Sequence, residues 1–130
     1  MRFFTLAIGM FMASGPLMAE CNESLLRLDT WQIEPIDSDT NRLTTNFTYV
    51  GERTIRMLDA SAGFRDVLGK NIASFALDRD VYLVEGASHQ EIGRWGPYTF
   101  ERLLDMNPDD VIPWVCVNAV VFEDGTVEEF

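Results

Sequence analysis

The sequence holds one histidine, His89, in the polar stretch GASHQEIG, together with 21 acidic residues. An imidazole beside a carboxylate can serve as an acid–base pair, so a small carboxylate-dependent hydrolase is one functional alternative. A zinc site built from several histidines is excluded, and Ser88 would point away from His89 in an extended strand. We predict no catalytic residue, no cofactor and no metal, and we expect His89 to lie exposed in a loop or at a sheet edge.

The stretch DSDTN, residues 37–41, places oxygen-bearing side chains at alternate positions, as the start of a calcium loop does. Arg42 then stands where such a loop needs glycine, and Thr48 where it needs a bidentate glutamate. We therefore interpret the stretch as a polar turn between two strands. Acidic pairs nearer the C-terminus, such as 123–124 and 128–129, could attract calcium weakly if they gather at the ends of the fold.

Residues 1–19, MRFFTLAIGMFMASGPLMA, combine a positive start, an uncharged apolar run and a small residue at Ala19. This pattern is typical of a secretory signal peptide cleaved after Ala19. An uncleaved anchor is an alternative, but the run barely reaches the length of a membrane span and a Gly-Pro pair interrupts it. A lipid-modified Cys21 is another, although bulky Glu20 precedes it. We expect a periplasmic or secreted protein with no stable membrane span after cleavage.

The two cysteines, Cys21 and Cys116, both remain after cleavage. An oxidising compartment favours a disulfide between them, and with two cysteines only one connectivity exists. A Cys21–Cys116 bridge closes a loop of nearly the whole mature chain, which the chain-entropy treatment values at about 4–5 kcal/mol. Two unpaired buried cysteines are the alternative.

Residues 20–130 are enough for a single domain with one core. The chain carries 21 acidic and 10 basic residues, for a net charge of −11, and loss of Arg2 with the leader changes this to −12. Such an acidic surface opposes binding to nucleic acid and to anionic lipid, because both are negatively charged. It favours solubility and cationic partners.

Period-two alternation of apolar and β-branched residues predicts strands over most of the mature chain. The strongest signal is VIPWVCVNAVVF, residues 111–122, and the hairpin dipeptide Asp124-Gly125 follows it. The other expected strands are 26–34, 42–50, 55–64, the runs IASFALD (72–78) and VYLVE (81–85), and the terminal TVEEF.

One segment has helical spacing instead. TFERLLDM, residues 99–106, predicts a two-turn helix with Thr99 as its N-cap and Asn107-Pro108 as its stop. Short strands separated by turn signals, with one short helix, predict a mainly β protein: an antiparallel immunoglobulin-like β-sandwich of seven or eight strands.

The stretch GRWGPYTF is the predicted contact surface. Arg94, Trp95 and Tyr98 flank a Gly-Pro turn, and these residue types dominate binding hot spots. The structural interpretation, which we favour for the two rings, has Trp95 and Tyr98 closing the end of the sandwich above the short helix. Trp114 lies two residues before Cys116, so we expect both on the same face of their strand, with the indole beside the disulfide.

Three runs carry a resemblance to a known family: NFTYVGERTIRMLDASAGFRDVLGK, FALDRDVYLVEG and VCVNAVVFEDGT. Over about residues 46–130, their pattern resembles the small exported bacterial immunoglobulin-like sandwiches of the FxLYD type. At the place of the family motif the chain has AGFRD, which shares the terminal Asp66 and an apolar Phe64. The resemblance implies a binding or accessory module and supplies no catalytic residues.

We therefore predict a secreted or periplasmic, non-enzymatic binding or accessory module, whose partner is another envelope or extracellular protein. Two alternatives stay open. One is the carboxylate-dependent hydrolase that would use His89, and the other is a structural subunit that assembles through its edge strands.

Overall fold

The structure is a computed structural model that describes residues 21–96 and 98–130, so the predicted signal peptide lies outside the described residues. Seven strands form two antiparallel sheets, which confirms the predicted mainly β sandwich. None of the described helices has the length and apolar character needed to cross a membrane. The strands are β1 (Leu26–Pro35), β2 (Asn41–Tyr49), β3 (Ile55–Asp66), β4 (Asn71–Ala76), β5 (Ser88–Trp95), β6 (Val111–Phe122) and β7 (Val127–Glu129).

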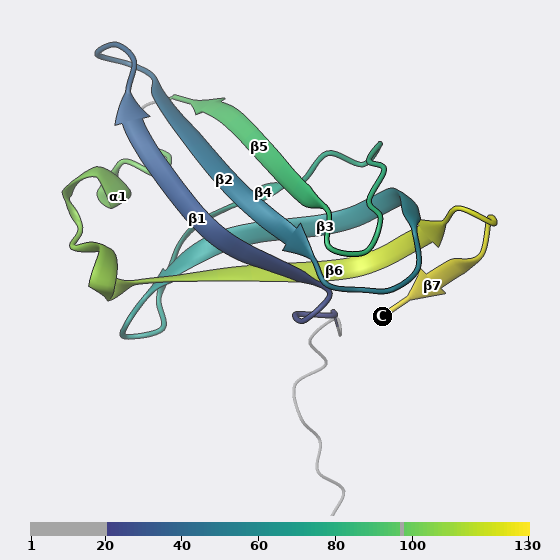
Figure 1. Cartoon of the computed structure of the whole chain (residues 1–130). Coiled ribbons are helices and arrows are strands. Elements are labelled where there is room, and N and C mark those ends of the chain that lie inside the picture. The colour runs from purple at the N-terminus through teal and green to yellow at the C-terminus, as the bar shows by residue number, and fades with distance from the viewer. Residues whose placement is uncertain (1–20, 97) are drawn as a thin grey trace, which may run out of the picture.

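The two sheets are three and four strands wide. One has the order β1-β2-β5 and the other the order β4-β3-β6-β7, so the chain passes from sheet to sheet between β2 and β3, between β4 and β5, and between β5 and β6 (Figure 1). This distribution of strands is that of an immunoglobulin-like sandwich. Connections at one end are the β1–β2 and β3–β4 turns and the segment after β5, which contains the helix α1 (Arg102–Asp105).

The core lies between the sheets because the inward face of each central strand is apolar. In β2 every second residue is buried, including Leu43, Phe47 and Tyr49. In β3 the residues of one face, Leu58, Ala60, Ala62 and Phe64, are all buried. Burying each of the larger side chains contributes about 1.5–3 kcal/mol.

One predicted strand is absent, and one observed strand was not predicted. The run VYLVE does not form a strand: within it Leu83 makes one isolated bridge with Ile55. The third strand of the smaller sheet is β5, which lies in the polar stretch where the sequence predicted no strand and placed His89 in a loop or at a sheet edge. Its inward positions include His89, Glu91 and Gly93, so the apolar alternation that signals a strand is missing.

The helix is shorter than its pattern indicated. It has a single turn, its N-cap position is Glu101 instead of Thr99, and the 3₁₀ helix η1 (Pro108–Asp110) follows it. The reason lies in the backbone of Phe100, whose φ of 58° is left-handed and incompatible with a helix that begins earlier. Phe100 is buried, so packing of its ring outweighs the local helical preference.

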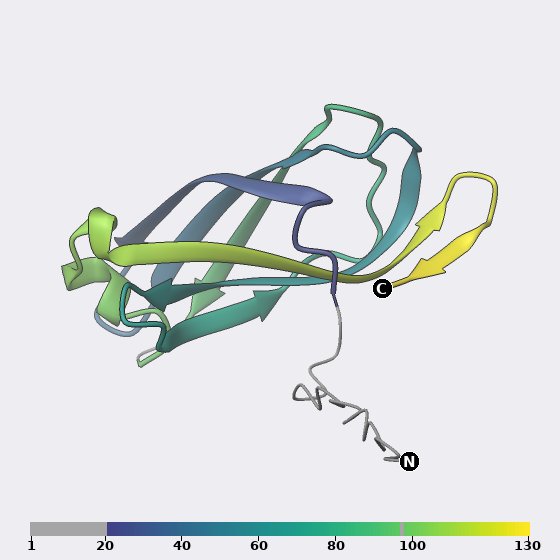
Figure 2. The same ribbon diagram turned by 90° about the horizontal axis from the view of Figure 1, so that it is seen from below.

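A disulfide joins Cys21, ahead of β1, to Cys116 on β6, with a Cα–Cα distance of 5.3 Å. Asn22 and Val117 exchange backbone hydrogen bonds beside it, at 2.8 and 2.9 Å. The chain then crosses to the smaller sheet, where β1 begins at Leu26 (Figure 2). The bridge therefore ties the start of one sheet to a central strand of the other.

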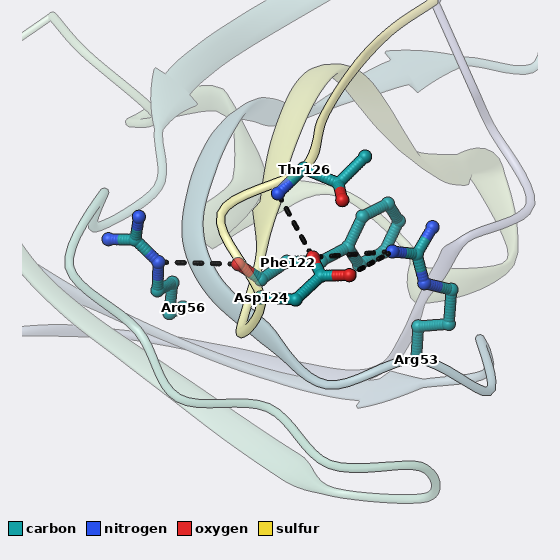
Figure 3. A network of polar contacts seen from close by, with 5 residues as sticks. All are labelled: Arg53, Arg56, Phe122, Asp124 and Thr126. Atoms are coloured by element: carbon teal, nitrogen blue, oxygen red, sulfur yellow. Dashed lines mark hydrogen bonds and ion pairs between the residues drawn. The ribbon is translucent and has the colours of Figure 1, made fainter.

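The far end of the molecule is fixed by a polar network around the β6–β7 hairpin (Figure 3). The guanidinium of Arg53 lies 3.8 Å from the ring centre of Phe122 and pairs with Asp124 at 3.2 Å. Arg56 donates to the carbonyl of Phe122, and the N–H of Thr126 donates to Asp124. That backbone donor, with help from Arg53, lowers the pKa of Asp124. We interpret this network as structural, because its contacts tie the β6–β7 hairpin to Arg53 in the β2–β3 turn and to Arg56 on β3.

Candidate binding surface

The structure separates the three residues of the predicted contact surface. Trp95 is half-buried at the end of β5, where its ring centre lies 5.2 Å from that of Phe100 and 6.4 Å from that of Phe75. Arg94 is exposed on the opposite face of β5, and Tyr98 is 91% exposed beyond it. Trp95 therefore lies against the core, whereas Tyr98 is free to contact a partner.

Tyr98 lies on a loop that is anchored from one side. Phe100 is buried and packs edge-on against Phe64 and Phe75, with ring centres 6.1 and 6.0 Å apart. Both Tyr98 and Phe100 have left-handed backbones, with φ of 74° and 58°. Each such conformation costs a non-glycine residue about 1–2 kcal/mol, so the anchoring contacts must offset the cost. Because Phe100 is fixed in the core two residues later, the exposed ring of Tyr98 can move only a short distance.

Asp66 organises the neighbouring β3–β4 turn. Its Oδ1 accepts the N–H groups of Leu68 and Lys70, at 2.9 and 3.0 Å, and its Oδ2 accepts the guanidinium of Arg102 at 2.8 Å. Arg102, more than any other group, holds the pKa of the Asp66 carboxyl below its ordinary value, and the N–H of Lys70 adds to the effect. One buried carboxylate thus ties the turn to α1.

The loop-end surface consists of the exposed apolar residues Val67, Leu68 and Tyr98 and the hollow beside them. Leu68 is 91% exposed and Val67 is 53% exposed, and exposed apolar side chains that gather in a patch can mark a binding site. The hollow has a volume of about 330 Å³ and is lined in part by Asp66, Lys70, Tyr98 and Arg102. Glu101 also lines the hollow, and the exposed Asp105, Asp109 and Asp110 belong to α1 and η1.

His89 lies on β5, at the free edge of the smaller sheet. A sheet edge was one of the two positions expected for it, but the side chain is half-buried instead of exposed. Its Nε2 is 2.8 Å from Oε1 of Glu91, and the same oxygen accepts the N–H of Asp78 at 2.6 Å. In the described residues, the only polar partner of the ring is Glu91. The pair ties β5 to the segment that follows β4.

Trp114 and Cys116 share the outer face of the larger sheet, as their spacing predicts. The indole covers Gly63, where a Cβ would come within 2.7 Å of the ring, and the guanidinium of Arg65 lies 5.3 Å from the ring centre. Its Nε1 is buried and has no acceptor among the described residues. Glycine is thus required at position 63 so that the indole can lie flat on β3.

The stretch DSDTN forms the polar turn between β1 and β2. The N–H of Asp39 donates to the side chain of Asp37, and the N–H of Ile36 donates to the carbonyl of Thr40. Within residues 21–96 and 98–130, no three metal-ligating side chains gather in one place.

Sequence reasoning missed Asp66 and Leu68 as parts of a site, although the run RDVLGK contains a signal. An aspartate three residues before a glycine suits a turn in which the carboxylate accepts backbone N–H groups, and Gly69 has the required φ of 86°. No local pattern in the sequence predicts the bond from Arg102 to Asp66, because the two residues are 36 positions apart.

Fold and surface together define a disulfide-linked, immunoglobulin-like β-sandwich with an apolar patch on the loops at one end. Comparisons with protein-family profiles, with curated proteins and with solved structures find no match to this chain. Its function must therefore be inferred from the geometry described above.

Proposed function

We propose that the chain is a secreted or periplasmic, non-enzymatic binding module that contacts another envelope or extracellular protein through the loop-end surface. The observation that carries this proposal is the exposure of Leu68 and Tyr98 on loops that buried groups hold in place. A pre-positioned apolar side chain loses little conformational entropy when it binds, so more of its burial energy contributes to affinity.

Charge indicates the chemistry of the partner. Glu101 lines the hollow of the loop-end surface, and the mature chain as a whole has a net charge near −12. A protein with an apolar pocket surrounded by lysine and arginine would be complementary in both respects. The resemblance to FxLYD-type modules supports an accessory role of this kind, and the disulfide suits an oxidising compartment.

Affinity capture tests the proposal. The mature, oxidised chain is immobilised and exposed to the native envelope fraction, and captured proteins are identified by mass spectrometry. The variant Leu68→Ser/Tyr98→Ser removes the apolar centre, and we expect it to lose the partner that the wild-type chain captures.

The matched control is Tyr82→Ser/Ile92→Ser, because these residues are also exposed, at 64% and 60%, and belong to other parts of the surface. This control should capture the partner as the wild-type chain does. If both double variants capture it equally, the loop-end surface is not the binding site.

One observation favours the hydrolase alternative. His89 and Glu91 form a half-buried imidazole–carboxylate pair, the arrangement that an acid–base catalyst needs. The described part of the chain brings no serine, threonine or cysteine hydroxyl or thiol into hydrogen-bond contact with the ring. We therefore regard the pair as a structural link, which predicts that His89→Gln changes stability and leaves any partner capture intact.

A further inference from the structure

β6 is paired along its whole length on one side only. Towards β3 the ladder runs from Phe122 opposite Ile55 to Val111 opposite Asp66. On the other side β7 pairs with residues 119–121, and Asn22 bridges Val117. In the part of the chain that the structure describes, residues 111–116 have no strand beside them on this second side. The free stretch is about half of β6.

The direction of the backbone groups shows what this edge offers. Val117 uses its N–H and its C=O to bond Asn22, so both point away from β3. Because these groups alternate along an antiparallel strand, the N–H and C=O of Val115 and the C=O of Pro113 point the same way. Pro113 has no N–H to donate, which suits a position on an edge. The edge therefore presents a short row of hydrogen-bonding groups that have no partner within residues 21–96 and 98–130.

A groove of about 460 Å³ runs beside the edge, between β6 and the start of β1. Pro113 and Val115 line it from the larger sheet, and Leu26 and Leu28 from the smaller one. Arg27, on the same stretch of β1, lies at its polar side. The volume is in the range of specific binding sites, and the mixture of apolar walls and free backbone groups suits an extended peptide.

We propose that this edge binds an extended segment of another polypeptide, which adds to β6 as a further antiparallel strand. Both segments that already pair on this side of β6, at Asn22 and in β7, are antiparallel to it. Alternate side chains of the incoming strand face the groove and are apolar. The side chains between them face solvent and include lysine or arginine, since the mature chain is strongly acidic.

A second copy of this chain is the less suitable occupant. Two copies with a net charge near −12 repel each other, and this repulsion is strong when they come within about one screening length. The inference is independent of the loop-end surface, because the residues that line the groove include neither Leu68 nor Tyr98.

The test begins with a phage-displayed library of random nine-residue peptides, selected on the mature, oxidised chain. Enriched peptides are synthesised, and their affinity is measured for the wild-type chain, Val115→Pro and Val115→Ala. Val115→Pro removes the one N–H that the edge offers and leaves the β3 ladder intact, since that N–H points away from β3. Val115→Ala removes the two methyl groups of this buried side chain but keeps the N–H, so it shows what altered packing alone does to affinity.

We expect selected peptides to alternate apolar and basic residues and to slow hydrogen exchange of the Val115 amide. Their affinity should fall roughly tenfold or more for Val115→Pro and remain within about threefold for Val115→Ala. If thermal melts show that Val115→Pro is unfolded, Leu28→Lys replaces it, because a charged side chain in the groove should produce the same loss. The variant Leu68→Ser/Tyr98→Ser should bind these peptides normally, which separates this result from a failure of the proposed function.

Four outcomes would overturn the inference. The first is that no peptide is enriched, and the second is that binding is equal for Val115→Pro and Val115→Ala. The third is that the peptide protects the amides of Leu68 and Lys70 instead of Val115. The fourth is a stable dimer in sedimentation that Val115→Pro dissociates, which would assign the edge to a second copy of the chain.

Discussion

At the scale of single residues, the stretch GRWGPYTF shows how neighbouring aromatic residues acquire different roles. Trp95 belongs to β5 and takes an inward position, so its indole joins the buried rings of Phe75 and Phe100. Tyr98 comes after the strand has ended, and its backbone directs the ring into solvent. The sequence could predict that aromatic residues cluster here, but only the end of β5 decides which of them is buried.

Separate alanine variants should reveal this division. Trp95→Ala removes a half-buried ring and should lower the free energy of unfolding by about 3 kcal/mol, at the low end of the range for large aromatic residues. Tyr98→Ala should change it by no more than about 0.5 kcal/mol, as for other surface substitutions. Thermal or urea unfolding measures both. A large loss of stability for Tyr98→Ala would mean that its ring is part of the core.

Asp66 should make stability depend on pH in acid. Its folded-state pKa lies below the ordinary value for aspartate, about 3.9, so the carboxylate stabilises the native state at neutral pH. That contribution is fully present above the unfolded-state pKa and is lost as the pH falls through the lower folded-state value. We expect the melting temperature of the wild-type chain to fall more steeply below about pH 4 than that of Asp66→Asn.

The control for this experiment is Asp105→Asn, which changes an exposed aspartate of α1. It should retain the steep wild-type decline in acid. The same acid profile in wild type and Asp66→Asn would show that the bonds to Leu68, Lys70 and Arg102 do not govern acid stability.

At the scale of strands and turns, the predictable elements are those in which local pattern and burial agree. β2, β3 and β6 each have one apolar face, and their registers place those faces on the core. β5 could not be predicted in this way, because a strand at a sheet edge tolerates His89 and Glu91 on its inner face. The run VYLVE has strand composition, but the structure gives it only the bridge between Leu83 and Ile55.

A further prediction concerns the disulfide, which links the segment before β1 to β6. Cys21 and Cys116 are separated by 95 residues, so the bridge restricts the unfolded chain and should contribute about 4–5 kcal/mol to stability. Reduction should also release Asn22 and the start of β1 before the rest of the sheet, since few other contacts hold that segment against β6. Hydrogen exchange with and without reductant measures this effect as lost protection around residues 25–33. Equal protection in both states would contradict it.

At the scale of the whole molecule, acidic charge is spread over both ends of the sandwich. The turn after β6 contains Glu123 and Asp124, and η1 contains Asp109 and Asp110 at the other end. Ion pairs at the two ends, such as those of Arg53 with Asp124 and of Arg102 with Asp66, neutralise only part of this charge. Long-range repulsion therefore opposes folding, and salt should weaken it.

Raising the concentration of sodium chloride from about 10 mM to about 200 mM should increase the melting temperature, because the screening length falls from about 30 Å to less than about 8 Å and repulsion between the acidic groups weakens. Calcium chloride at matched ionic strength should give nearly the same increase, since the described residues gather no set of three metal-ligating side chains. A specific calcium site would instead add stabilisation that grows with the logarithm of calcium concentration at constant ionic strength. That result would show that some of these carboxylates form a calcium site in the turns that carry them, and not only a general acidic surface.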